Sequence, residues 1–261
     1  MRSLSTAATG MLAQQLNVEV ISNNIANMNT TAYKRQRAEF QDLLYDNLRR
    51  SGSQSSDTGT VVPSGVQVGI GVRTAAVYRI SEQGNLVGTS NAYDMAIRGN
   101  GYFQVQLPTG EDAYTRAGSF QLSSTGQLVT PDGYPVSPGI TIPSDATDVT
   151  INDSGEVQVK IDGQITPSIV GQVDLAIFFN DAGLEAIGDN LLKETPASGP
   201  PTVGVAGSPG FGTLIQGFLE TSNVNPVQEI TSLITAQRAY EMNSRVITTS
   251  DEMLQTTTTL R

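Results

Sequence analysis

The sequence predicts a mainly β protein with an α-helix at each end: an all-β central domain inserted between an N-terminal and a C-terminal helix. Apolar residues recur every seven positions near both ends of the chain, which is a helical spacing. The middle of the chain shows short stretches of period two, separated by residues typical of tight turns. The chain has 261 residues, 38% of them hydrophobic, enough for one large domain or two smaller ones with real cores.

The first helix is expected within residues 1–30. One face of this segment carries four apolar residues at intervals of seven, namely Leu4, Met11, Val18 and Ile25. Residues seven positions apart lie about two turns from each other on the same side of a helix. The segment is therefore predicted to form a helix with one apolar seam.

The second helix is expected within residues 216–261. Its seam has the same spacing and consists of Leu233, Tyr240, Ile247 and Leu254. Asn225 can cap the first free amides, and Pro226 suits the first helical position. Because an isolated helix of this kind is marginally stable in water, each seam needs a partner. The partner is the other helix, the β domain or further copies of the chain in a polymer, and the spacing alone does not decide among them.

The β domain is expected at residues 71–215. Stretches rich in β-branched or aromatic residues occur at 102–107, 119–122, 149–151, 157–161 and 173–179. Residues that suit tight turns separate them, at 108–110, 124–126, 131–133, 153–155 and 162–163. Strands this short and this regularly interrupted favour an all-β domain over a parallel α/β sheet.

A linking segment is expected between the first helix and the β domain, at residues 31–70. Residues 51–71 are rich in serine and glycine, a composition typical of a flexible linker. The second half of this stretch alternates in hydrophobicity, however, at Val61, Val66, Val68, Ile70 and Val72. An extended, hairpin-like arm is therefore the alternative.

An asparagine-rich stretch, residues 22–36 with the sequence SNNIANMNTTAYKRQ, follows the first seam. Asn27 and Asn29 come directly after Ile25. Asparagine side chains can replace backbone hydrogen-bond partners where a helix ends. We therefore expect this stretch to set the direction in which the chain leaves the helix.

The residue types exclude most catalytic sites. The chain contains no cysteine and no histidine, so disulfides, Ser-His-Asp and Cys-His arrangements, and nitrogen or thiolate zinc sites cannot form. The acidic turn at 152–156 lacks the full set of calcium ligands and is expected to be a hairpin. We expect no catalytic, cofactor-binding or metal site, and hence no enzyme.

The charge distribution argues against nucleic acid as a partner. The net charge is −10, and residues 51–225 hold six basic and seventeen acidic side chains, whereas phosphate binding needs concentrated lysine and arginine. The longest apolar run, 175–179, is far shorter than the roughly 20 residues of a membrane helix. No membrane span is therefore expected.

Several motifs together resemble the flagellar axial-protein family of bacteria. They are MRSLSTAATGMLAQQ, SNNIANMNTTAYKRQRAEFQDLLY and ETSNVNPVQEITSLITAQRAYEMNSRVITTSDEML at the two ends, and QGNLVGTSNAYDMAIRGNGYFQV and YTRAGSFQLSSTGQLVTPDGYPV inside the chain. The resemblance covers essentially the whole chain and is greatest to the distal rod branch of the family. The residues that match its rod signature are Ser22, Asn23, Asn24, Ala26, Asn27, Asn29, Thr31, Tyr33 and Lys34.

The chain departs from the family pattern at two places. Ala32 stands where the family usually has glycine before the aromatic residue. If the turn needs a positive φ at this position, Ala32 is strained. The tail 255–261 (QTTTTLR) replaces a more apolar helix end with threonines, so fraying of the last helical turns is expected.

The resemblance implies an architecture. In the family the terminal helices pair as an antiparallel coiled coil that forms an inner tube around an export channel, and the β domain forms the outer tube. Distal rod proteins carry an added stretch after the first helix that is associated with a straight, rigid polymer. Here residues 46–63 occupy that place, with a predicted rigidity segment comprising Asp46, Asn47, Leu48, Arg49, Arg50, Asp57 and Pro63.

The resemblance also implies a function and partners. The chain is expected to polymerise helically into a rigid, hollow drive shaft of the flagellar basal body, exported without a cleaved signal peptide. Expected partners are further copies of the chain, proximal rod proteins, a hook or hook-junction protein, the bushing-ring proteins of the peptidoglycan and outer membrane, and the flagellar export apparatus. Two alternatives remain: a hook or proximal rod protein of the same family, or a secreted β-rich binding or hydrolytic module.

Overall fold

The structure, a computed structural model, describes residues 2–52, 64–162 and 166–259. The chain forms two compact units. Unit 1 comprises Met1–Ala26, Gln36–Tyr78 and Asn225–Arg261, and unit 2 comprises Asn27–Arg35 and Arg79–Val224. A helical domain interrupted by a β domain is thus confirmed. The linking segment expected at 31–70 is divided between the two units, because residues 27–35 belong to unit 2 and residues 36–78 to unit 1.

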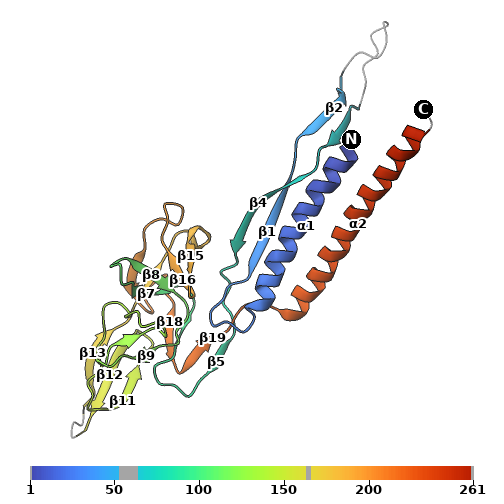
Figure 1. The fold of residues 1–261 in the computed structure, drawn as a ribbon. Helices are drawn as coiled ribbons and strands as arrows, with labels where there is room; N and C mark the ends of the chain where they lie inside the picture. The colour runs from blue at the N-terminus through green and yellow to red at the C-terminus, as the bar shows by residue number, and fades with distance from the viewer. Residues whose placement is uncertain (1, 53–63, 163–165, 260–261) are drawn as a thin grey trace. The chain divides into compact units, whose positions relative to one another are not determined.

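Unit 1 contains the two long helices, α1 (Arg2–Ala26) and α2 (Pro226–Thr259), which pack against each other in antiparallel orientation (Figure 1). The predicted start of α2 is confirmed. Asn225 Oδ1 accepts hydrogen bonds from the amides of Val227 and Gln228, at 3.1 and 3.3 Å, as expected of an N-cap. At the other end the helix continues through the threonines of the tail to Thr259.

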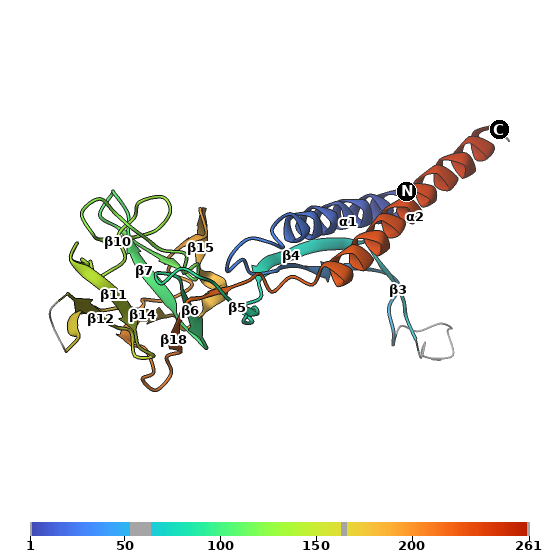
Figure 2. The same ribbon diagram turned by 90° about the horizontal axis from the view of Figure 1, so that it is seen from below.

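Four strands complete unit 1. β1 (Gln36–Asp42) pairs with β4 (Val72–Arg79), and this ribbon lies beside α1 in both views (Figures 1 and 2). β2 (Tyr45–Arg49) pairs antiparallel with β3 (Val66–Gly69), with Tyr45 opposite Gly69. This pairing agrees with the hairpin-like arm among the two interpretations of the linking segment. Val61, Asp57 and Pro63 lie outside the described residues.

Unit 2 is built from antiparallel sheets (Figure 2). The largest has six strands in the order β15-β16-β8-β7-β14-β17, with bounds Glu185–Gly188, Leu191–Lys193, Asp112–Thr115, Tyr102–Gln106, Asp174–Ile177 and Thr202–Val205. A three-stranded sheet contains β11 (Ala146–Ile151), β12 (Glu156–Ile161) and β13 (Ser168–Gln172).

Three two-stranded pairs and one short helix complete unit 2. The pairs are β6 (Met95–Arg98) with β18 (Thr213–Gln216), β5 (Leu86–Gly88) with β19 (Phe218–Glu220), and β9 (Gln121–Leu122) with β10 (Leu128–Val129). A 3-10 helix, η1, spans Asp181–Gly183. Each of the five stretches predicted as strands contains an observed strand, and the described turn glycines among those predicted, Gly110, Gly126, Gly133 and Gly155, have positive φ.

The central strands of the six-stranded sheet, β7 and β14, carry buried side chains on both faces. Successive side chains of a strand point to opposite sides. Phe103 and Leu175 belong to the larger core, and Phe103 contacts Phe120 edge-to-face with ring centroids 5.1 Å apart. Tyr102, which precedes Phe103, and Ala176, which follows Leu175, belong to a smaller cluster on the other face. Burial on both faces gives unit 2 a core of its own.

Candidate assembly surface

The closest contact between α1 and α2 is made by small and polar residues. Ser250 Oγ bonds to Ser3 Oγ at 3.4 Å, and Asn24 Nδ2 donates to Glu229 Oε2 at 3.2 Å. A methyl group on Gly10 would lie 2.9 Å from Asn243 Nδ2, so a larger residue there would require the Asn243 side chain to move. We call these six residues the polar row: Ser3, Gly10 and Asn24 of α1, and Ser250, Asn243 and Glu229 of α2.

The polar row follows one register along its full length. From Ser3 to Gly10 is one step of seven residues along α1, and from Ser250 to Asn243 is one step of seven backwards along α2. Two further such steps lead to Asn24 and Glu229. Asn24, Glu229 and Ser250 are buried, as is Ala236, which has the same spacing on α2. The row is therefore the interior of the helix pair.

The predicted seam residues lie beside this row rather than in it. Seven of the eight, Leu4, Met11, Val18, Ile25, Leu233, Ile247 and Leu254, are half-buried in unit 1, and Tyr240 is exposed. The polar row is a second repeat in the sequence. It consists of small and polar residues, so a search for hydrophobic periodicity does not detect it. An interval of seven shared by Glu229, Asn243 and Ser250 is the signal that could have identified it.

The first helix is covered on two sides. One side faces α2, and another packs against the strands, where Thr6 Oγ1 donates to the carbonyl of Ile70 at 3.2 Å and Thr9 Oγ1 accepts from the amide of Val72 at 3.4 Å. Four apolar residues of α1 are buried: Ala7, Ala13, Val20 and Ile21. The helix thus has part of its apolar surface inside the unit, while Leu12 is 66% exposed.

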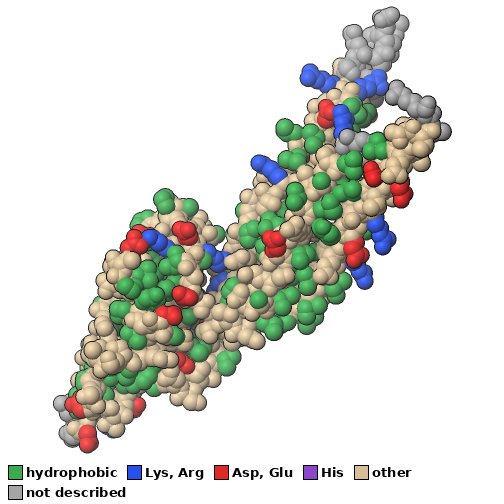
Figure 3. Space-filling view, viewed as in Figure 1, with side chains coloured by type: hydrophobic (Ala, Val, Ile, Leu, Met, Phe, Trp, Pro, Cys, Tyr) green, Lys and Arg blue, Asp and Glu red, His purple; other side chains and the backbone are tan. Residues whose placement is uncertain are grey.

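The second helix has the opposite distribution. Its buried residues are Glu229, Ala236 and Ser250, whereas Val227 is 75% exposed and Met242 61%. We call its exposed aliphatic and methionine side chains the outer face of α2: Val227, Ile230, Ile234, Met242, Val246 and Met253. Figure 3 shows hydrophobic side chains at the surface along this helix. A helix that buries polar residues and exposes apolar ones needs a further partner.

A second exposed apolar group lies on the arm formed by β2 and β3. Leu44 is 82% exposed, and Tyr45, Leu48, Val66, Val68 and Ile70 are also exposed. In the predicted rigidity segment, Asp46 forms an ion pair with Arg2, and Asn47, Leu48 and Arg49 lie in β2. Arg50 directly follows β2. The arm therefore offers apolar side chains next to charged ones.

Asn24 is a buried residue of the rod signature in unit 1. Only 1% of it is exposed. Its Nδ2 donates to the carbonyl of Gln36 at 2.9 Å and to Glu229, and its Oδ1 accepts from the amide of Gln36 at 2.8 Å. One side chain thus connects the end of α1 with the start of β1 and the first turn of α2. Of the two asparagines expected to act at the helix end, Asn27 accepts from the Thr30 hydroxyl through its side-chain Oδ1 and from the Thr30 amide through its backbone carbonyl, at 3.1 Å each.

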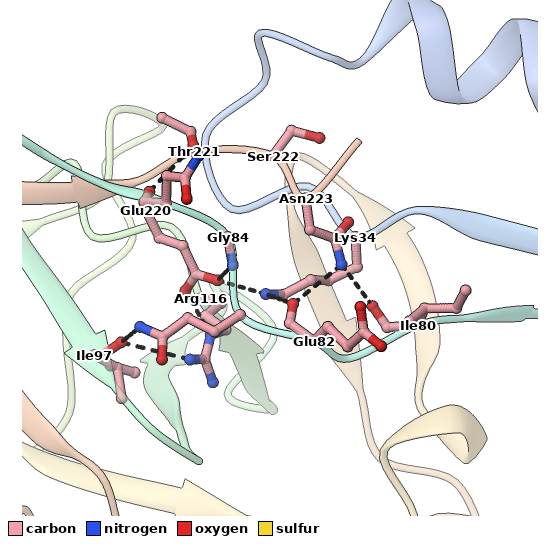
Figure 4. A network of polar contacts seen from close by, with 12 residues as sticks. Lys34, Ile80, Glu82, Gly84, Ile97, Arg116, Glu220, Thr221, Ser222 and Asn223 are labelled. Carbon is pink, nitrogen blue, oxygen red and sulfur yellow. Dashed lines mark hydrogen bonds and ion pairs between the residues drawn. The ribbon is translucent and has the colours of Figure 1, made fainter. Parts of the chain in front are cut away.

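Lys34, another residue of the rod signature, belongs to a buried ionic network in unit 2 (Figure 4). Glu220 of β19 is buried and accepts from Lys34 Nζ at 2.5 Å and from Arg116 Nε at 2.7 Å. Lys34 also donates to the carbonyl of Glu82 at 2.8 Å. Arg116 donates to the carbonyls of Gly101 and Gly99, at 2.9 and 2.6 Å. Neither Arg116 nor Glu220 was singled out from the sequence, because a single charge in a strand pattern carries no spacing signal.

The charged groups of this network shift each other's pKa values. Burial acts to raise the pKa of Glu220, but the positive charge of Arg116 and the hydrogen bond and charge of Lys34 outweigh it and lower that pKa below its usual value. Burial lowers the pKa of Lys34, against the opposing effect of Glu220. Glu220 is therefore held in its charged form.

The same network joins the segments by which the chain enters and leaves unit 2. Asn223 Nδ2 donates to the carbonyls of Ile80 and Glu82, each at 3.0 Å, and its Oδ1 accepts from the amide of Arg35 at 2.7 Å (Figure 4). The amide of Ile80 in turn donates to the carbonyl of Arg35 at 2.9 Å. Three segments far apart in sequence are thus held together by one asparagine.

Ala32 adopts the left-handed conformation that its place in the motif suggested. Its φ is 57°, and its amide donates to the carbonyl of Glu220 at 2.8 Å. Because a Cβ is unfavourable in this region, the departure from the family's usual glycine carries strain. The other signature residues are Ser22 and Asn23, exposed on α1, Ala26 at its end, and Asn29, Thr31 and Tyr33 in the segment that follows.

A small cavity of about 100 Å³ lies in unit 2, lined in part by Tyr102, Arg116 and Asp181. Burial raises the pKa of Tyr102 to about 12 and also raises the pKa of Asp181. Within residues 2–52, 64–162 and 166–259, acidic side chains do not gather in groups of three or more that could hold a metal ion. In the same ranges, neither helix is long and apolar enough to cross a membrane.

Comparison with known proteins gives the same class throughout the chain. Residues 4–34 match the model of the flagella basal body rod protein, residues 96–159 that of the flagellar hook protein FlgE/F/G D1 domain, and residues 215–260 that of the flagellar basal body rod FlgEFG protein C-terminal region. The matches include almost all of α1 with its signature, the centre of unit 2 and all of α2.

Individual relatives are similar over nearly their whole length. The flagellar basal-body rod protein FlgG of Caulobacter vibrioides is 64% identical over 100% of both chains. The proteins of the same name from Agrobacterium fabrum and Buchnera aphidicola are 54% and 51% identical, each over 97% of both chains. The chain therefore belongs to the flagellar basal-body rod protein family. Its function is that of a structural subunit of the distal rod of the bacterial flagellum.

Proposed function

We propose that this rod subunit polymerises helically with copies of itself into a rigid, hollow drive shaft. The shaft transmits torque from the motor to the hook and encloses the export channel. In it, the helices of unit 1 form the inner tube, and the β sheets of unit 2 form the outer tube. Contacts that repeat head to tail without closing into a ring generate an open helical filament.

The observation that carries this proposal is the outer face of α2. Val227, Ile230 and Ile234 in its first half, and Met242, Val246 and Met253 in its second half, are exposed, while α1 contacts the side that holds Glu229, Ala236 and Ser250. Covering each such side chain contributes about 1.5–3 kcal/mol when burial is complete. A neighbouring copy supplies this cover at every position along a polymer, and the half-buried seam residues extend the same surface.

The arm of β2 and β3 is the second contact in the proposed polymer. Its exposed apolar residues, among them Leu44 and Leu48, would pack on a neighbouring subunit and oppose the sliding that lets a filament bend. Residues 46–63 then act as a stiffness element, as the resemblance implies.

The proposed location is the part of the rod that crosses the periplasm and the outer envelope. Subunits reach it through the flagellar export apparatus, without a cleaved signal peptide. At its ends and along its length, the shaft contacts proximal rod proteins, the hook or a hook-junction protein, and the bushing-ring proteins of the peptidoglycan and outer membrane. No enzymatic step is part of this role.

The test is a pair of substitutions on exposed positions of α2. Ile234→Asp together with Met242→Asp places two charges on the outer face without touching the polar row. The purified, concentrated variant is expected to remain helical by far-UV circular dichroism and to form no tubes by electron microscopy, under conditions where the unchanged chain does. Ile234→Leu with Met242→Leu, which keeps the same two positions apolar, is the matched control and should polymerise. Tubes formed by both variants would contradict the proposal.

A further inference from the structure

The interior of the helix pair poses a problem of partner choice. Apolar side chains lie on the outer face of α2, yet α1 packs on the side of α2 that contains Glu229, Ala236, Asn243 and Ser250. Apolar contact is nondirectional, so hydrophobicity alone would let α1 pack on the outer face of any copy of α2. Something else must direct α1 to this less apolar side.

The contacts of the polar row distinguish the two arrangements. Asn24 and Glu229 are both buried, and they bond to each other at 3.2 Å. If α1 packed on the outer face of α2, Asn24 would meet aliphatic side chains there. Asn24 would keep its hydrogen bonds to the backbone of Gln36 but would lose the one to Glu229. A lost hydrogen bond at a buried polar group carries a desolvation cost, which disfavours that arrangement.

Shape makes the same distinction at the middle of the row. Gly10 is open enough for Asn243, whose Nδ2 would be only 2.9 Å from a methyl group at that position. At the far end the hydroxyls of Ser3 and Ser250 meet at 3.4 Å. All three contacts coincide only in one antiparallel register, since a shift of α2 by one turn removes each residue from its partner.

We propose that the polar row selects the partner and the register of α1, directing it to its own α2 and away from the apolar outer face of other copies. Single polar residues inside coiled coils set register and partner in this way, at a cost in stability. Replacing the row on α2 by apolar residues should therefore leave the helices packed but less selective. The inference concerns pairing within one subunit and does not depend on the proposed polymer.

Because the chain contains no cysteine, one engineered pair reports on this pairing directly. Ser3→Cys with Ser250→Cys places two thiols at the end of the row, where the hydroxyls are in contact. Oxidation of dilute, monomeric protein is expected to give mainly an internally cross-linked monomer, separable from cross-linked dimer by non-reducing electrophoresis.

The decisive comparison adds Glu229→Leu and Asn243→Leu to this pair. The yield of internal cross-link is expected to fall several-fold and the yield of dimer to rise, while far-UV circular dichroism shows unchanged helix content. Gln228→Leu with Thr248→Leu adds the same apolar groups at exposed positions of α2 and should keep the internal cross-link. An unchanged cross-link yield in the row variant would overturn the proposal. Loss of helix in that variant would overturn it too, because the row would then serve stability rather than selection.

Discussion

Arg116 Nε and Glu220 Oε2 lie 2.7 Å apart inside unit 2, and the other carboxylate oxygen of Glu220 forms an ion pair with Lys34 Nζ. Lys34 belongs to the segment that follows α1, Arg116 follows strand β8, and Glu220 ends strand β19. One carboxylate therefore forms ion pairs with two cations contributed by distant parts of the chain. Removing one member of a buried ionic group leaves the others without a counter-charge.

Glu220→Gln is expected to destabilise unit 2 by about 3–5 kcal/mol at pH 7, because Arg116 and Lys34 stay buried without their anion. Urea unfolding followed by the near-UV circular dichroism of tyrosine measures this change. Glu111→Gln removes the exposed partner of Lys193 and should cost less than about 1 kcal/mol. An equal decrease in the free energy of unfolding for both variants would show that the buried network is no more stabilising than an exposed ion pair.

The same carboxylate predicts a dependence on acid. The pKa of Glu220 is lower in the folded chain than its ordinary value of 4.5. The unfolded chain therefore binds more protons at low pH, and the stabilisation is complete above about 4.5 and is lost as pH falls through the folded pKa. Urea midpoints of the unchanged chain should decrease below this pH. The Glu220→Gln variant should show a smaller decrease, and parallel pH profiles would count against this assignment.

Asn24→Ala is expected to destabilise unit 1 by about 2–3 kcal/mol, because the Gln36 backbone and Glu229 each lose a buried hydrogen-bond partner. Far-UV circular dichroism during urea unfolding follows the helices of this unit. Ser22→Ala, at an exposed position two residues earlier, should change the free energy of unfolding by less than about 0.5 kcal/mol. Similar values for both would mean that the contacts of Asn24 are not stabilising.

Ala32→Gly is expected to stabilise unit 2 by about 0.5–1 kcal/mol, because glycine adopts a φ of 57° without the steric cost of a Cβ. Ala182→Gly, at an exposed position of η1 without positive φ, should have the opposite sign. Urea unfolding of both variants tests the pair, and a destabilised Ala32→Gly protein would show that the packing of the Ala32 methyl group outweighs its strain.

Shortening residues 46–63 is expected to give bendable, hook-like polymers in place of straight ones, because the exposed apolar side chains of the arm, Leu48 among them, lose their place on neighbouring subunits. Negative-stain electron microscopy measures filament curvature. A variant with the same length of glycine and serine in place of these residues separates length from sequence and should also bend. Straight filaments from both variants would refute the stiffness role.

Local spacing was sufficient to predict both helices and some of the strands. Seven-residue intervals predicted α1 and α2, and Asn225 with Pro226 predicted where α2 begins, because helix formation and capping depend on neighbours along the chain. Period two and the turn glycines predicted β7, β9, β11, β12 and β14 of unit 2 in the same way, whereas the other strands of that unit were not identified. The alternation around Val66 and Val68 also pointed to the pairing of β3 with β2.

Only the tertiary structure decided which face of each helix is inside. The seam containing Leu4 and Leu233 has the stronger hydrophobic signal, yet Asn24, Glu229 and Ser250 are more deeply buried. The type of a residue indicates the free-energy cost of burying its side chain, but the sequence does not show which polar partner that side chain will bond to. Asn24 and Glu229, which bond to each other, are 205 positions apart. Arg116 and Glu220, the buried partners in the ionic network with Lys34, were missed for the same reason, since the energy of a buried ion pair depends on the distance between its members, which only folding sets.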